Sequence, residues 1–237
     1  MKKFYLVFLF IITSCSDEIE EIIPETKLII TKVEWFDVDD NKLFNTYDYK
    51  YDKDFNLIAV LDKYSISTQQ YFYEDNKVVK SNFGNKYTEY TYDGELITSC
   101  KEYQLPFSGT FVRTDFEYNS KDQLISKKSY LGGNILTCQS SYTWNDKGNV
   151  ETEKNSCSSP EAYTFEYDNM KNRHSLLFNI GIQKIQKITN NNQIKVFNGS
   201  SLSHTFEYEY NEFGYPTSST VSFGVREEIT YEEVIIQ

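Results

Sequence analysis

Side chains that carry oxygen are spaced like the ligands of a calcium loop near the start of the chain. Asp37, Asp39, Asn41, Asn45 and Asp48 would fill positions 1, 3, 5, 9 and 12 of such a loop. However, a lysine follows Asn41 where the loop needs glycine, and no helical pattern flanks the segment. The simpler interpretation is an acidic hairpin turn between two strands, so we expect no metal or other cofactor.

Cysteine is the second residue type that could do chemistry, and the chain has four. In a hairpin that pairs Trp144 with Val150, Cys157 falls one position out of line with Cys138 and points to the other face. A one-residue bulge would bring these two cysteines together as a disulfide. Cys100 then remains as the odd thiol, and we expect it to be buried.

Other residue types give little support for catalysis. The two histidines, His174 and His204, lie in unrelated parts of the sequence, and no catalytic motif surrounds either. Glutamates at alternate strand positions could supply the carboxylate pair of a glycoside hydrolase, but any sheet that bears glutamate offers such pairs. Tyrosines could stack on sugar rings, although packing in a core is the simpler interpretation. We therefore expect no enzymatic activity, with a surface glycan hydrolase as the alternative.

The N-terminus has the pattern of a secretion signal. Lys2 and Lys3 precede the apolar stretch Phe4 to Ile12, which is too short to span a bilayer as a helix but suits a signal peptide. The stretch leads into Thr13-Ser14-Cys15, which resembles a bacterial lipobox. The resemblance implies cleavage after residue 14 and attachment of several acyl chains to Cys15, which together anchor a protein stably. An ordinary signal peptide with an incidental cysteine is the alternative.

The segment after the cysteine, residues 15–26, is acidic and reads as a tether. Ser16-Asp17-Glu18 is similar to the export signal that directs Bacteroidota lipoproteins to the outer face of the outer membrane. The whole chain carries a net charge of −11, and loss of the two leader lysines makes it −13. This charge argues against nucleic acid as a partner, because binding phosphate needs a basic surface.

Residues 27–237 consist of one repeated unit, an aromatic residue, any residue, a second aromatic residue and Asp or Asn. The clearest copies are Tyr49-Lys50-Tyr51-Asp52, Tyr90-Thr91-Tyr92-Asp93, Phe116-Glu117-Tyr118-Asn119, Tyr142-Thr143-Trp144-Asn145, Phe165-Glu166-Tyr167-Asp168 and Tyr208-Glu209-Tyr210-Asn211. The second aromatics, which we expect to form the repeat core, are Tyr51, Tyr73, Tyr92, Tyr118, Trp144, Tyr167 and Tyr210. The last gap is double, and Ile188 to Ile194 fills it as a degenerate copy. The period is then about 23 residues, which fits two short strands and two turns.

The position of the next apolar residue supports hairpins. It lies six residues after the second aromatic in most copies and four residues after it in the shortest, where we expect the loop to be two residues shorter. The apolar residues are Leu57, Val79, Leu96, Leu124, Val150 and Ile194. Even offsets keep these residues on the same face as the aromatics. The Asp or Asn after the aromatic can cap the turn through its side chain.

These patterns predict an all-β fold, an antiparallel meander of about 16 to 18 short strands in a rolled or barrel-like sheet. The aromatic pairs would occupy one face, and residues such as Lys50 and Glu117 the other. The most helix-like stretch, Ile180 to Ile188, also alternates as a strand. A membrane barrel is the alternative, but its strands need about ten residues with a continuous apolar band. Charges such as Lys127 and Glu151 interrupt the strands here.

The copy Trp144-Asn145-Asp146-Lys147-Gly148-Asn149-Val150 resembles the YD repeat of RHS-type proteins. Together with the lipobox, the chain is similar to a group of Bacteroidota lipoproteins of unknown function with a porin-like β fold. This resemblance implies a lipid-anchored outer-membrane protein exposed on the cell surface. We expect a binding or structural module for a glycan or protein, with an RHS-like toxin or contact system as another alternative.

Overall fold

The computed structural model describes residues 25–106, 109–157, 162–178 and 180–236. The leader and most of the tether, with Cys15, lie outside these residues. The described chain forms 16 antiparallel strands and two short helices. The strands are β1 (Thr26–Asp37), β2 (Leu43–Tyr51), β3 (Leu57–Leu61), β4 (Ser67–Glu74), β5 (Lys77–Phe83), β6 (Lys86–Asp93), β7 (Leu96–Gln104), β8 (Phe111–Tyr118), β9 (Leu124–Leu131), β10 (Ile135–Trp144), β11 (Val150–Asn155), β12 (Tyr163–Lys171), β13 (Asn191–Asn198), β14 (Ser201–Tyr210), β15 (Pro216–Val221) and β16 (Val225–Ile235).

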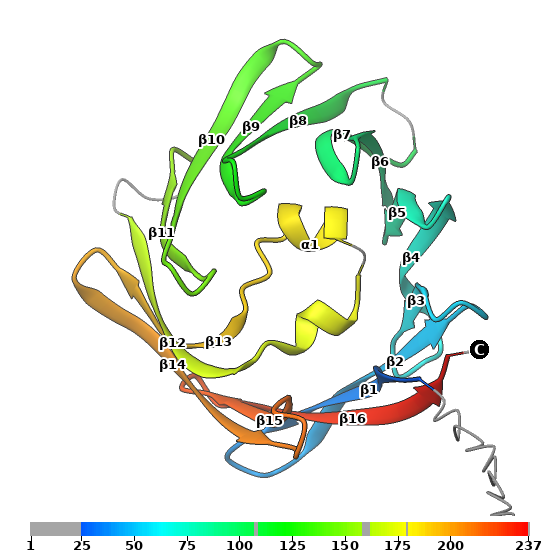
Figure 1. The fold of residues 1–237 in the computed structure, drawn as a ribbon, viewed down its shortest axis with the longest axis vertical. Coiled ribbons are helices and arrows are strands. Elements are labelled where there is room, and N and C mark those ends of the chain that lie inside the picture. The colour runs from blue at the N-terminus through cyan, green and yellow to red at the C-terminus, as the bar shows by residue number, and fades with distance from the viewer. Residues whose placement is uncertain (1–24, 107–108, 158–161, 179, 237) are drawn as a thin grey trace, which may run out of the picture.

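Each strand pairs with its neighbour in sequence, and β16 pairs with β1, so the meander closes into a barrel (Figure 1). The all-β meander predicted from the repeat is therefore confirmed. The described chain begins and ends at the same end of the barrel, where backbone N–H of Ile236 donates to the carbonyl of Glu25. We call this the tether end and the opposite one the far end. Within the described part of the chain, no helix has the length and apolar composition needed to cross a membrane.

The repeated Asp or Asn builds the turns at the tether end. In the β2–β3 turn, Oδ1 of Asp52 accepts hydrogen bonds from the backbone N–H groups of Asp54 and Asn56, at 2.9 Å each. Asn119, Asn145 and Asn211 accept in the same way from residues two and four positions further on. The side chain thus replaces a backbone acceptor in a three-residue loop, which explains why this position in the repeat is Asp or Asn.

The predicted pairing is right for the longer copies and wrong for two shorter ones. Tyr51 lies opposite Leu57, as expected. Tyr73, however, lies opposite Val78 and not Val79, and Tyr92 opposite Ile97 rather than Leu96. The loops of these copies are shorter by one residue, not by two, so the apolar partner comes five residues after the aromatic. The bulge beside the second aromatic is the same in the longer and the shorter copies.

One repeat is divided between the two ends of the chain. Tyr231 of β16 lies opposite Ile30 of β1, in the arrangement that Tyr51 and Leu57 have within one hairpin. The hydroxyl of Tyr231 donates to the carbonyl of Pro216 at 2.6 Å, and that of Tyr51 donates to the carbonyl of Ile30 at 2.7 Å. The β1–β16 pair, which we call the seam, therefore has the same side-chain contacts as the hairpins beside it. Closing the barrel in this way completes an eighth repeat.

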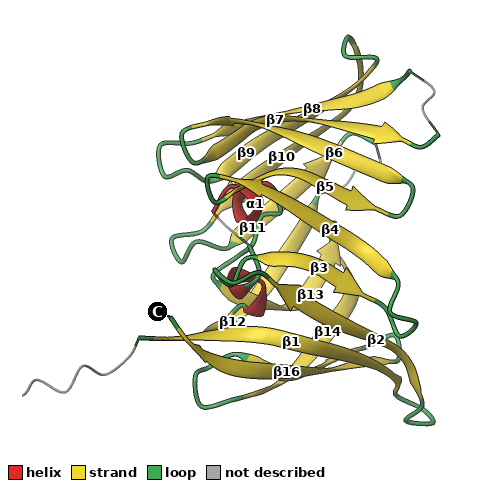
Figure 2. Cartoon of the chain, turned by 90° about the vertical axis from the view of Figure 1, so that its right-hand side faces the viewer, coloured by secondary structure: helices red, strands yellow, loops and turns green. Residues whose placement is uncertain are grey.

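The connection between β12 and β13 turns into the barrel and occupies its lumen. It contains a 3-10 helix, η1 (Arg173–Leu176), and an α-helix, α1 (Ile180–Ile185), which lie inside the ring of strands (Figure 1 and Figure 2). We call residues 172–178 and 180–190 the plug. The expectation that Ile180 to Ile188 alternates as a strand is wrong, as is the degenerate repeat from Ile188 to Ile194. β13 begins only at Asn191 and pairs directly with β12.

The core forms where the plug meets the wall. Ile30, Leu57, Val78, Ile97 and Leu124 are at most 1% exposed, and each comes from the tether-end half of a successive repeat. The plug adds Leu177 and Ile182 to the same cluster. The plug therefore fills part of the space that a ring of this many strands leaves at its centre.

Candidate functional site

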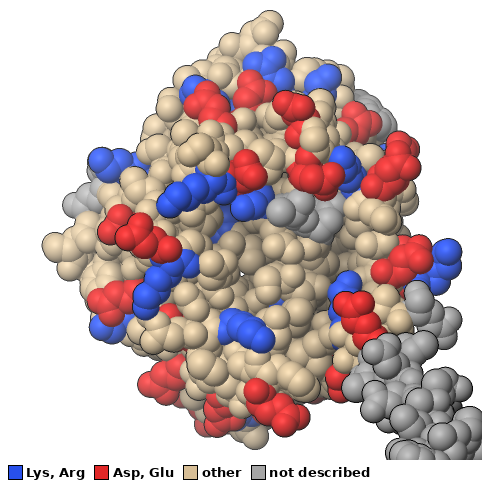
Figure 3. Space-filling model, in the orientation of Figure 1, with Lys and Arg blue, Asp and Glu red and all other residues tan. Residues whose placement is uncertain are grey.

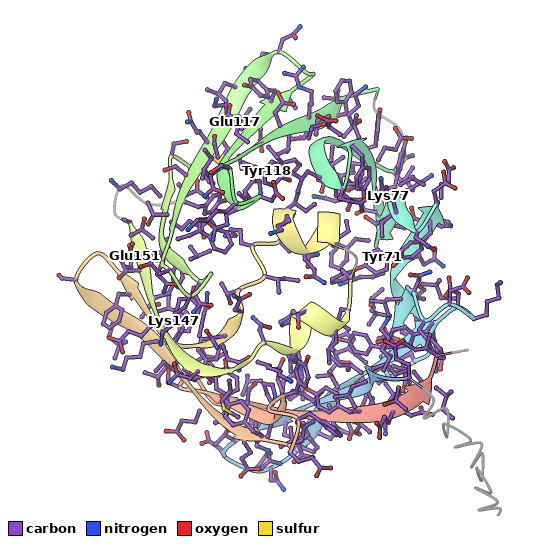
Figure 4. The ribbon with its side chains drawn as sticks, in the orientation of Figure 1. Tyr71, Lys77, Glu117, Tyr118, Lys147 and Glu151 are labelled. Atoms are coloured by element: carbon purple, nitrogen blue, oxygen red, sulfur yellow. A yellow bond between two sulfur atoms is a disulfide. The ribbon has the colours of Figure 1, made fainter. Side chains whose placement is uncertain are left out.

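The second aromatic of most repeats points into the lumen and is fixed by one hydrogen bond. Its hydroxyl, or the indole N–H of Trp144, donates to the carbonyl of the buried apolar residue one repeat earlier. The pairs are Tyr51 with Ile30, Tyr73 with Leu57, Tyr92 with Val78, Tyr118 with Ile97 and Trp144 with Leu124, at 2.7–2.9 Å. Figure 4 shows Tyr71 and Tyr118 on the inner side of the ring of strands. These bonds join consecutive hairpins into a rigid wall.

The pattern changes in the repeats beside the plug. The hydroxyl of Tyr167 lies 3.5 Å from Nε2 of Gln193, and that of Tyr210 bonds the carboxylate of Asp168. Burial raises the pKa of Tyr210, and the bond to Asp168 raises it further. Asp168 also accepts from backbone N–H of Asn192 at 3.1 Å. This side chain therefore holds together the two strands from which the plug departs.

Two ion pairs attach the plug to the wall. Nη2 of Arg173 lies 2.7 Å from Oε2 of Glu227, and Nζ of Lys187 lies 2.6 Å from Oε2 of Glu153. Glu227 accepts a further hydrogen bond from Oγ of Ser219 at 2.8 Å. The Arg173 and Glu227 side chains are only 14% and 17% exposed, so their pairing is screened less than a surface pair.

Helix α1 rests on the hairpin of β6 and β7 through Gly181. A Cβ at this position would lie 2.8 Å from the ring of Tyr92 and 3.0 Å from the carbonyl oxygen of Glu95. On another side of the plug, the rings of Phe178 and Tyr71 meet edge to face at 5.2 Å between centroids. Glycine therefore sets how closely the helix approaches the wall.

A cavity of about 620 Å³ lies between the plug and the wall formed by β1 to β5 and β16. We call it the cup. Its aromatic lining is Trp35, Tyr47, Tyr49, Phe83 and Phe178. Its polar lining is Thr68, Gln69, Arg173, His174, Gln186 and Glu227. Phe83 ends β5 and is 60% exposed, which marks the mouth of the cup at the far end.

The side chains that line the cup carry almost no net charge. His174 is exposed to the lumen, where desolvation by the surrounding barrel lowers the pKa of its imidazole and the adjacent Arg173 lowers it further, which favours the uncharged form at pH 7. The charges of Arg173 and Glu227 offset each other. Burial also raises the pKa of Tyr49, which keeps its hydroxyl protonated. The cup therefore offers hydrogen-bonding groups without a net charge.

A second cavity of about 320 Å³ lies on the other side of the Arg173–Glu227 pair. It is lined by β13 to β16 and by the polar part of the plug, including Asn172 and Thr189. Because both cavities border the same ion pair, this pair divides the lumen.

The proposed calcium residues form a hairpin turn. Oδ1 of Asp37 accepts from backbone N–H of Asp39, and Oδ1 of Asn41 accepts from the Arg226 guanidinium. Asp48 is separated from the turn and lies in β2 opposite Lys32. Among the described residues, no group of three or more His, Cys, Asp or Glu side chains is placed to hold a metal.

Cys138 and Cys157 are joined by a disulfide, with Cα atoms 5.5 Å apart. A bulge beside Trp144 leaves Glu151 without a partner in β10 and shifts the register by one residue. This shift places Cys157 opposite Cys138. Cys100 is free and partly buried among lumen side chains, and burial raises the pKa of its thiol to about 11. It is therefore protonated at neutral pH and is a poor nucleophile.

Sequence reasoning did not identify the residues of the cup. Arg173 lies six residues after Tyr167, at the position where the repeat predicts an apolar residue. Glu227 looked like one of many glutamates on a sheet. The doubled gap between Tyr167 and Tyr210 was the available signal, because it marks an insertion that a regular meander does not need.

Solved structures of porin-like proteins share this architecture. A porin-like protein from Bacteroides uniformis ATCC 8492 superposes with a TM-score of 0.62 at 14% sequence identity, covering 86% of this chain and 98% of that one. A porin-like protein from Bacteroides vulgatus ATCC 8482 gives a TM-score of 0.57 at 11% identity, covering 87% and 99%. No protein-family model and no curated protein matches the sequence. At these identities the likeness establishes the fold alone.

Proposed function

We propose that this chain is a non-enzymatic binding module of the bacterial cell envelope, whose ligand is a glycan or a protein. It is anchored to the outer membrane by lipids on Cys15 and exposed on the cell surface. The porin-like neighbours suggest a barrel protein of the envelope. The lipobox resemblance at Cys15 supports the anchor, and the acidic tether supports surface exposure.

The outer wall supports a barrel beside the membrane rather than within it. Charged side chains occupy the outward positions of most strands, and both signs are spread around the perimeter (Figure 3). Examples are Lys50, Glu89, Lys101, Asp115, Glu117, Lys128, Glu166, Lys195 and Glu209. An arginine or lysine facing lipid at the bilayer midplane costs roughly 2–4 kcal/mol, so this wall suits water. A separate lipid anchor is then what would hold the barrel at the membrane.

The observation that carries the binding function is the cup. Its size is within the range of about 300–1,000 Å³ typical of small-molecule sites, and it combines aromatic walls with a few polar groups. The carboxylates beside the plug, Glu153 and Glu227, are each paired with a cation. This supports binding rather than the acid–base pair of a glycoside hydrolase, in which one carboxyl must donate a proton.

The anchor is tested by metabolic labelling of cells with an alkyne-tagged fatty acid. The full chain should incorporate label, Cys15→Ala should not, and Cys100→Ala should label normally. Protease added to intact cells should degrade the wild-type protein if it is displayed outside. Equal labelling of the Cys15→Ala variant would contradict the anchor, and protection from protease would contradict surface display.

A further inference from the structure

The cup has a chemistry that selects among the ligands open to a binding module. We propose that it binds a neutral oligosaccharide, with one or two sugar units inside the barrel and the remainder leaving through the far end. This inference rests on the proposed binding function and names the ligand class of that site.

The aromatic walls suit the apolar faces of sugar rings. Trp35 lies against Tyr47, with ring centroids 5.1 Å apart and planes at 70°, so each ring is held by its neighbour. Phe178, on the plug, is fixed in the same way by Tyr71. Rigid aromatic surfaces lose little conformational entropy on binding, and the C–H face of a pyranose packs flat against such a ring. The cup presents these surfaces on both the wall and the plug.

The polar groups favour a ligand rich in hydroxyls over an alkyl chain. Gln69 projects from the wall and Gln186 from the plug, so hydrogen-bonding groups face the space from two sides. An aliphatic ligand would cover the amides of Gln69 and Gln186 and offer them no hydrogen-bonding partner, which is unfavourable. Sugar hydroxyls can both donate and accept, and therefore match the C=O and the NH2 of these amides.

The charge balance favours a neutral sugar over an acidic one. Arg173 is the cation that borders the cup, and Glu227 is already paired with it at 2.7 Å. A uronic acid would have to displace Glu227 and leave that carboxylate partly buried without its partner, which is strongly unfavourable. A neutral sugar can bond to the pair from outside without breaking it.

The two tryptophans of the chain make this inference directly measurable. Trp35 lines the cup, whereas Trp144 lies in another repeat with its indole N–H bonded to Leu124. In a full-length Trp144→Tyr variant, which has the residue type of the other repeats at this position, Trp35 is the sole tryptophan and can be excited selectively over the tyrosines. We would titrate it with neutral gluco-, manno- and galacto-oligosaccharides, with uronic-acid oligosaccharides and with laurate. At least one neutral series should change the Trp35 emission saturably.

Paired glutamine variants locate the binding. Gln69 faces the lumen, and the adjacent Gln70 faces outward, where its Oε1 accepts a hydrogen bond from Nδ2 of Asn82. Gln69→Ala and Gln186→Ala should each weaken binding about tenfold, which corresponds to the loss of one hydrogen bond of about 1.4 kcal/mol. Gln70→Ala should leave binding unchanged. Gln186 is exposed to the lumen, so its replacement tests the site even if Gln69→Ala, which removes a partner of Tyr71, destabilises the barrel.

Several results would overturn the inference. Binding of laurate alone would identify an apolar-ligand site, and preference for uronic acids would contradict the charge argument. If a neutral sugar bound the Gln69→Ala and Gln186→Ala variants as tightly as the protein with both glutamines, its site would lie outside the cup. No response to any neutral series would refute the sugar ligand, while the labelling of Cys15 and the protease test would still report independently on the envelope anchor.

Discussion

Replacing Tyr118 with phenylalanine tests the hydrogen bonds that join consecutive repeats. The Tyr118 hydroxyl donates to the carbonyl of Ile97 at 2.7 Å, and Ile97 is fully buried. The change removes a bond with a net contribution of about 1 kcal/mol and leaves the carbonyl one partner short. We expect a loss of roughly 1–2 kcal/mol in unfolding free energy. For a barrel of this size, each kcal/mol should lower Tm by roughly 2–4 °C.

Equilibrium unfolding in urea, followed by far-ultraviolet circular dichroism, would measure the effect. Two matched changes serve as controls. Tyr64→Phe, at a residue 70% exposed, should stay within about 0.5 kcal/mol of wild type. Tyr167→Phe should cost less than Tyr118→Phe, because its hydroxyl has only a 3.5 Å contact with Gln193. If Tyr118→Phe were as harmless as Tyr64→Phe, the hydrogen-bonded ring would not stabilise the barrel.

Three further predictions concern the plug and the buried tyrosines. Gly181→Ala should displace α1, because the new Cβ would meet a backbone carbonyl at 3.0 Å; limited proteolysis should then cut within the plug, and unchanged resistance would contradict this. Arg173→Met should cost roughly 2–4 kcal/mol in thermal unfolding, and adding Glu227→Met should recover much of it; additive losses would show that the pair is not coupled. Burial raises the pKa of Tyr142 and Tyr167 to about 12. Unfolded tyrosine ionises at about pH 10, so stability should be full below pH 10 and fall as pH rises towards 12. Tyrosinate absorbance should appear together with unfolding, and its earlier appearance in the folded barrel would argue against buried rings.

The repeat made most of the fold predictable. Each copy contains a strand, a capped turn and a strand, and these are local patterns that a single sequence displays. The side of the sheet taken by Tyr51 and Trp144 followed from alternation alone. The exact partners across the sheet could not be predicted from alternation, because a loop that is shorter by one residue places Val78 rather than Val79 opposite Tyr73. Loop length decides this register, because the bulge beside the second aromatic is the same in long and short copies.

The plug could not be predicted from local pattern. The segment Ile180–Ile185 has apolar residues at positions compatible with a strand or a short helix. Its helical form depends on a lumen that exists only after all the strands have closed around it. The same holds for the cup, in which Trp35, Arg173 and Glu227 are brought together from distant parts of the chain. The pairing of Tyr231 with Ile30, which closes the barrel, could not be predicted from a local pattern either, because the two halves of that repeat lie at opposite ends of the sequence.

An engineered disulfide across the seam tests most directly whether the sheet closes to enclose a lumen. Glu34 of β1 and Glu228 of β16 lie directly opposite each other on the outer wall, at the Cα spacing of a strand pair that a disulfide can bridge. In a Cys100→Ser background, Glu34→Cys with Glu228→Cys should form an intramolecular bond in the monomer, seen by mass spectrometry of non-reduced peptides. Glu34→Cys with Glu166→Cys should not form a bond. If both thiols of the first variant stayed free, or linked only separate molecules, the barrel would be open and its enclosed site would not exist.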